Sequence, residues 1–91
     1  MQVGQGLPGA DLVRDGLRDL AEGTESTAAL LVSIGAPRLR QLGIDVPRSI
    51  SGPEHRLYLL LAQIDPDSAH ARYNALVGRL VSFERALACV R

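Results

Sequence analysis

The C-terminal third of the chain carries the clearest hydrophobic pattern. Apolar or aromatic side chains recur there at alternating spacings of four and three residues, which is the period of one helix face. They are Ala69, Tyr73, Leu76, Leu80, Phe83, Leu87 and Val90. No break interrupts the pattern from Pro66 to Val90, so it predicts a single helix about 37 Å long that packs against other helices through this face.

Four further helices are predicted upstream, at about residues 12–22, 25–35, 37–42 and 53–64. Asp11 and Thr24 are the expected N-caps of the first two, because short polar side chains satisfy free amide groups there. Ser51 and Glu54 have the spacing of a capping box before the fourth. Pro37 suits the first turn of a short third helix. The predicted fold class is all-α, a small bundle of about five helices, one very short, with a long C-terminal helix.

The length of 91 residues allows one domain with one core. Residues 1–10 contain three glycines and one proline, and we expect them to form a flexible N-terminal arm. Residues 11–91 are expected to form the single helical domain.

Two of the predicted helices lack a clear solvent-facing side. The segment 25–35 is apolar around its whole circumference apart from Ser33, and the C-terminal helix carries small residues opposite its large ones. Glu84 projects into the apolar arc of that helix and calls for an arginine or solvent nearby. These features predict a homodimer, with the alternative that the small residues form an ordinary exposed face. The candidate interface residues are Leu30, Leu31, Ile34, Leu59, Ala75, Gly78, Ser82 and Glu84.

Composition narrows the possible functions. The formal net charge is zero, and all ten basic residues are arginine. The absence of lysine excludes a Schiff-base lysine and the lysine of a Walker phosphate loop. One cysteine, no signal-like N-terminal segment and no apolar run of membrane-spanning length lead us to expect a cytoplasmic protein with no membrane partner.

The glycine and histidine motifs offer little chemistry. Gly4, Gly6 and Gly9 have the spacing of a dinucleotide fingerprint, but they follow no strand, so we expect no cofactor. His55 and His70 would lie at opposite ends of two antiparallel helices, which leaves a metal or acid–base site only if it is assembled across a dimer. Since no nucleophile, base and acid have a recognisable spacing, we predict that the chain is not an enzyme.

Charge is unevenly distributed along the chain, with an acidic first helix and a cationic segment after it. Arg38, Arg40, Arg48 and Arg56 are therefore candidate nucleic-acid contacts for a small DNA- or RNA-binding regulator. The helix that would enter a groove is apolar, however, whereas base recognition needs hydrogen-bonding side chains. The favoured interpretation is a non-catalytic, homodimeric interaction or regulatory module that binds another protein.

Overall fold

The computed structural model describes residues 6–90, which contain four α-helices and no strand. They are α1 (Ala10–Ala21), α2 (Thr27–Gln41), α3 (Pro53–Ile64) and α4 (Ala69–Val90). The all-helical prediction and the long C-terminal helix are confirmed. The predicted number of five helices is wrong, because two of the expected segments form one continuous helix.

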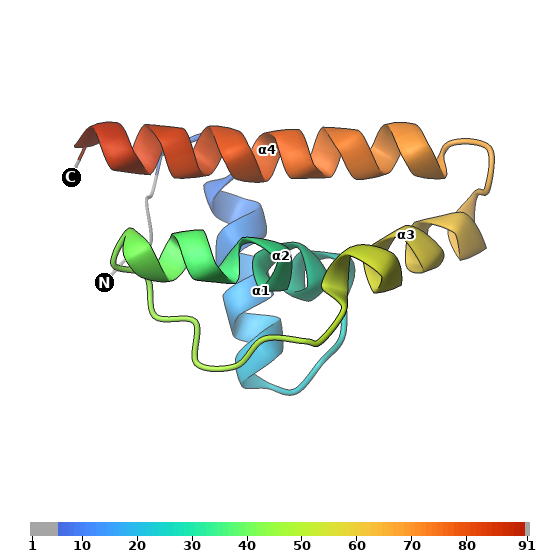
Figure 1. Cartoon of the computed structure of the whole chain (residues 1–91), viewed down its shortest axis with the longest axis horizontal. Helices are drawn as coiled ribbons and strands as arrows, with labels where there is room; N and C mark the ends of the chain where they lie inside the picture. Colours follow the sequence, from blue (N-terminus) through green and yellow to red (C-terminus); the bar gives the residue numbers. More distant parts are fainter. Residues whose placement is uncertain (1–5, 91) are drawn as a thin grey trace.

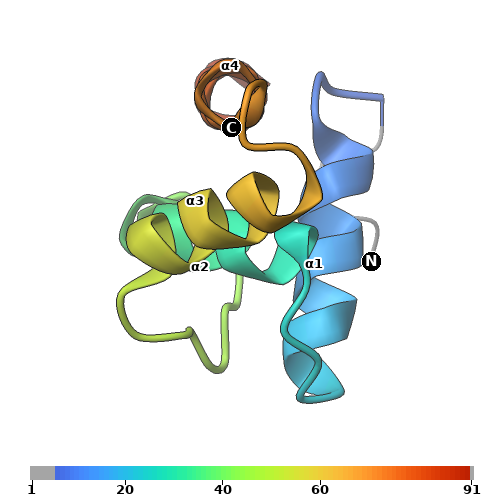
Figure 2. The same ribbon diagram turned by 90° about the vertical axis from the view of Figure 1, so that its right-hand side faces the viewer.

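The long helix α4 lies along one side of the molecule, over the crossed helices α1 and α2 (Figures 1 and 2). α3 and α4 are antiparallel and joined by a short turn, and α4 then continues above α2 (Figure 1). α1 stands nearly perpendicular to α4 and makes its most extensive contacts with α2. α2 begins near the middle of α4 and runs away from the α3–α4 turn, so the turn end of α4 faces α3 rather than α2 (Figure 1).

The core is centred on α2. Leu30, Leu31 and Val32 each have 0% exposed surface, which explains the all-round apolar pattern of this segment. α1, α3 and α4 all contact α2, so a single chain buries the apolar stretch from Ala29 to Gly35 apart from the partly buried Ile34. Phe83 and Leu80 of α4 are buried against this centre, as the alternating four- and three-residue spacing of apolar side chains predicts.

α1 and α2 cross at close range because a glycine lies at the contact. A Cβ atom on Gly16 would lie 2.4 Å from the carbonyl oxygen of Ala28 and 2.4 Å from a methyl carbon of Val32. Only a residue without a side chain lets the two backbones approach this closely. The crossing explains why Gly16 falls on the apolar face of α1.

Pro37 lies inside α2 and does not begin a separate helix. A proline here removes one helical hydrogen bond, because its nitrogen carries no hydrogen for the carbonyl of Ser33. Ala36 and Leu39 on either side are 1% and 0% exposed, so continuing the helix keeps both side chains in the core. This burial outweighs the lost hydrogen bond and joins the two predicted segments.

The helix caps differ from the predicted ones. Ser26, not Thr24, is the N-cap of α2, and its hydroxyl accepts a hydrogen bond from the Ala29 amide at 3.0 Å. Glycines in the left-handed region precede α1 and α3, so the predicted caps Asp11 and Ser51 make no capping bond. Each capping position differs from the predicted one by only one or two residues, a scale that depends on local backbone geometry.

α4 starts at Ala69, three residues after the predicted start. The carboxylate of Asp65 accepts hydrogen bonds from the Asp67 amide at 3.2 Å and from the Ser68 hydroxyl at 2.9 Å. These bonds hold 66–68 in a turn ahead of the helix.

Part of the predicted N-terminal arm packs onto the domain. Residues 1–5 lie outside the described residues, but Leu7 packs against the core and Ala10 is buried at the start of α1. Gly9 lies so close to α4 that a Cβ atom on it would be 2.7 Å from the Arg79 carbonyl oxygen. Residues 7–10 are therefore attached to the domain.

Candidate functional site

The interface candidates on α2 occupy the core of the single chain. Leu30 and Leu31 have no exposed surface, and Ile34 is partly buried. A residue without accessible surface has nothing to offer a partner unless the chain unfolds locally. Leu30 and Leu31 are therefore corrected from interface residues to core residues, since α1, α3 and α4 already cover them.

The candidates on α4 divide into an exposed and a half-buried group. Ala75, Gly78 and Ser82 are exposed, and a Cβ atom on Gly78 would have no neighbour within 4 Å. The small residues thus lie on the open side of α4, opposite the large ones.

Glu84 is held beside the crossing of α2 and α4. One of its carboxylate oxygens would lie 3.0 Å from a Cβ atom on Gly35, so the carboxylate fits where that glycine leaves space. Partial burial raises the pKa of Glu84 above its usual value, and the charge of Arg38 on α2 opposes this in part. The arginine that the sequence called for near this carboxylate is therefore Arg38.

A groove lies between α3 and α4, beyond the start of α2. It has a volume of about 370 Å³ and is lined by Thr27, Leu61, Ile64, Arg72, Ala75, Leu76 and Arg79. Ile64 follows Leu57 and Leu61 on the same face of α3, at helical spacings of four and three. Those two leucines are 0% and 4% exposed, but Ile64 is 62% exposed because α2 does not extend beneath it.

The charged residues of the groove are only partly neutralised within the chain. Arg79 forms a 3.4 Å ion pair with Asp11 of α1. Arg72 forms no ion pair with any residue among 6–90, and neither does Asp67, which lies in the turn before α4. One cation at the groove and one anion beside it therefore face solvent. Sequence reasoning included Ala75 but missed Ile64 and Arg72, because the position of α2 beneath α3 is not a local property of the sequence.

Leu59 lies on a different face of α3 and is 47% exposed. A shallow depression beside it is lined by Glu25, His55, Arg56, Leu59, Leu60 and Gln63. Arg56 makes a two-point ion pair there with Glu25, at 3.1 and 2.6 Å, and this contact lowers the pKa of Glu25. The depression is thus closed on one side by an internal ion pair.

The four candidate nucleic-acid arginines differ in their partners within the chain. Arg56 pairs with Glu25, and Arg40 donates two hydrogen bonds to the Val46 carbonyl, at 3.1 and 2.7 Å. Arg38 lies near Glu84. Arg48 differs from the other three. Its side chain forms no ion pair and no hydrogen bond with residues 6–90. A phosphate backbone favours several free cations in a row, whereas three of these four arginines have partners within the chain.

The two histidines are exposed and belong to different helix starts. His55 lies in the first turn of α3, whereas His70 lies in the first turn of α4, where its ring is 3.2 Å from the Asn74 amide nitrogen. Because α3 and α4 are antiparallel, these starts are at opposite ends of the pair. No group of three potential metal ligands occurs among residues 6–90.

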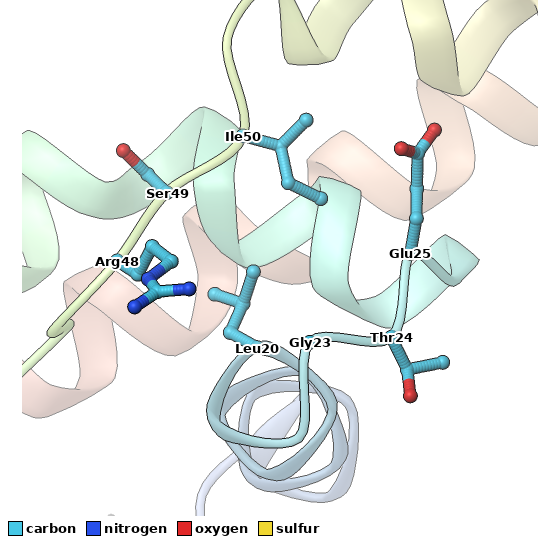
Figure 3. Close-up of a pocket in the computed structure, with 7 residues that line it drawn as sticks. All are labelled: Leu20, Gly23, Thr24, Glu25, Arg48, Ser49 and Ile50. Atoms are coloured by element: carbon cyan, nitrogen blue, oxygen red, sulfur yellow. The ribbon is translucent and has the colours of Figure 1, made fainter.

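A third concavity, of about 190 Å³, lies between the end of α1 and the segment 44–50 (Figure 3). It is lined by Leu20, Gly23, Thr24, Glu25, Arg48, Ser49 and Ile50. The side chains of Leu20 and Ile50 point toward each other across it, and the Arg48 guanidinium extends toward Leu20 (Figure 3). The concavity therefore combines two aliphatic walls with one cation.

Comparisons with protein-family models, with curated proteins and with solved structures give no match to this chain. Among residues 6–90, no helix has the length and apolar character needed to cross a membrane.

Proposed function

We propose that the protein is a non-catalytic helical interaction module that forms a homodimer through the α3–α4 groove. The observation that carries this proposal is the exposure of Ile64. It continues the core-facing side of α3 past the edge of the core, and it is 62% exposed beside Leu61 and Leu76. Covering such a side chain contributes about 1.5–3 kcal/mol, so an uncovered core face favours association.

The charges around the groove favour a second copy as the occupant. Each chain presents Arg72 at the groove and Asp67 at the turn beside it, and neither has an ion-pair partner within residues 6–90. A two-fold axis brings the same patch of both copies together, so each copy can offer its anion to the other's cation. The surface formed by the groove and the turn is thus complementary to the same surface of a second copy, both in charge and in apolar character.

Sedimentation equilibrium over a range of concentrations tests the proposal. The unmodified protein should be dimeric at high concentration, and Ile64→Asp should be monomeric because it places an unpaired carboxylate in the groove. Leu59→Asp is the matched control, since it makes the same change on another exposed face of α3. A monomeric unmodified protein would contradict the proposal, and so would a dimer that Leu59→Asp disrupts and Ile64→Asp leaves intact.

Charge reversal tests the proposed orientation. Arg72→Asp and Asp67→Arg should each weaken the dimer, because each places like charges opposite one another. The double variant exchanges the two charges and should recover much of the lost affinity. If both single variants and the double variant dimerise as the unmodified protein does, Asp67 and Arg72 do not meet across the interface.

A further inference from the structure

The concavity beside α1 has rigid apolar walls. Leu20 is 5% exposed, and the backbone amide of Ile50 donates a 3.0 Å hydrogen bond to the Ser33 hydroxyl of α2. That hydroxyl in turn donates to the Ala29 carbonyl at 2.9 Å, so Ile50 is fixed to the buried helix. The Thr24 amide bonds to the Asp19 carbonyl at 2.8 Å and holds the opposite side of the concavity. The space between Leu20 and Ile50 is therefore maintained by the fold.

Arg48 supplies the one charge of the concavity lining that is not neutralised within residues 6–90. Glu25 contributes to its lining, but its carboxylate is engaged by Arg56 on α3 and turns away from the space between Leu20 and Ile50 (Figure 3). Arg48 has no ion-pair partner within residues 6–90 and extends its guanidinium toward Leu20. One cation without a counter-ion thus lies beside an aliphatic slot.

We propose that this concavity binds a small carboxylate with a branched aliphatic body. The aliphatic part lies between Leu20 and Ile50, and the carboxylate accepts two parallel hydrogen bonds from Arg48, the geometry in which a guanidinium fits a carboxylate best. A volume of about 190 Å³ is smaller than the roughly 300–1,000 Å³ of drug-sized sites, which limits the ligand to a short chain. A free acid and the C-terminal carboxylate of a peptide ending in leucine share this chemistry.

The site is independent of the proposed dimer, because none of its lining residues lies in the α3–α4 groove. Its test therefore gives the same answer in the unmodified protein and in the Ile64→Asp variant. Failure of one proposal leaves the other standing.

NMR titration of the ¹⁵N-labelled protein with 4-methylpentanoate tests the proposal. The amides of Gly23, Thr24 and Ser49 should shift with saturation at about millimolar concentration, as expected for one exposed ion pair with a small apolar contact. The uncharged 4-methylpentanamide should bind at least about tenfold more weakly, since Arg48 then loses its charged partner. N-acetylleucine and a tripeptide ending in leucine distinguish the two sources: the one that shifts these amides at the lower concentration is the favoured form.

Arg48→Gln should weaken carboxylate binding at least about tenfold. Because Arg48 is exposed, the variant should remain folded, and its ligand-free spectrum should resemble that of the unmodified protein. Arg14→Gln makes the same charge change on the exposed side of α1 and should leave binding unaltered. The proposal is overturned if no carboxylate moves the three amides up to about 20 mM, or if the amide compound binds as tightly as the acid.

Discussion

At the scale of single residues, Glu84 shows how a packed crossing changes the chemistry of one side chain. Its carboxylate occupies the space that Gly35 leaves between α2 and α4, and burial raises its pKa while Arg38 acts in the opposite direction. The charged form is thus less favourable in the folded protein than in the unfolded chain. The periodicity of α4 placed Glu84 in the apolar arc, but the glycine and arginine that surround it come from another helix.

The raised pKa of Glu84 predicts a specific pH dependence. Its contribution to stability is fully present below the usual value of 4.5 and is lost as the pH rises through the raised folded-state pKa. Glu84→Gln should therefore raise Tm at pH 7, and this gain should disappear at about pH 4. In carboxyl-carbon NMR, the Glu84 midpoint should lie above 4.5 and move higher in Arg38→Gln. A midpoint at or below 4.5 would show that Arg38 dominates over burial.

At the scale of helices, the α1–α2 crossing depends on Gly16. The Cβ atom of Gly16→Ala would lie 2.4 Å from the Ala28 carbonyl oxygen, a backbone atom that can move only if the helices separate. We expect a loss of about 2 kcal/mol or more in the free energy of unfolding, or about 10 °C in Tm. Gly78→Ala is the control, because it meets no atom within 4 Å on exposed α4 and should stabilise by about 0.5–1 kcal/mol. Equal effects in chemical denaturation would contradict the close crossing.

Helices were predictable from the sequence where the pattern was local. The extent of α3 and the burial of Leu80 and Phe83 on α4 follow from periodic apolar residues, but Val90 at the end of the same predicted face is 66% exposed. The continuity of α2 through Pro37 was not, because it depends on Leu39 reaching a core built by other helices. The same reason explains the groove: the spacing of Ile64 places it on the inner face of α3, but nothing local shows that α2 starts too late to cover it.

At the scale of the whole molecule, the dimer proposal predicts a change in shape. The chain has a radius of gyration of 12.6 Å and extents of 38 × 25 × 18 Å, and the groove lies between the end of α3 and the first half of α4. Two copies joined there form an elongated particle, which exceeds the radius of about 16 Å expected for a compact protein of twice the length. X-ray scattering should therefore give a radius above about 16 Å at high concentration and a value near 12.6 Å after dilution.

The same association should appear as a concentration-dependent thermal transition. A partner that binds only the folded chain raises stability by mass action, so a tenfold increase in protein concentration should raise Tm by about 3–5 °C where the dimer dominates. Ile64→Asp should show one Tm at all concentrations and a scattering radius near 12.6 Å throughout. Leu59→Asp should behave as the unmodified protein does, because its side chain lies outside the groove. A concentration-independent Tm in the unmodified protein, together with a constant radius, would show that Ile64 is tolerated in contact with water.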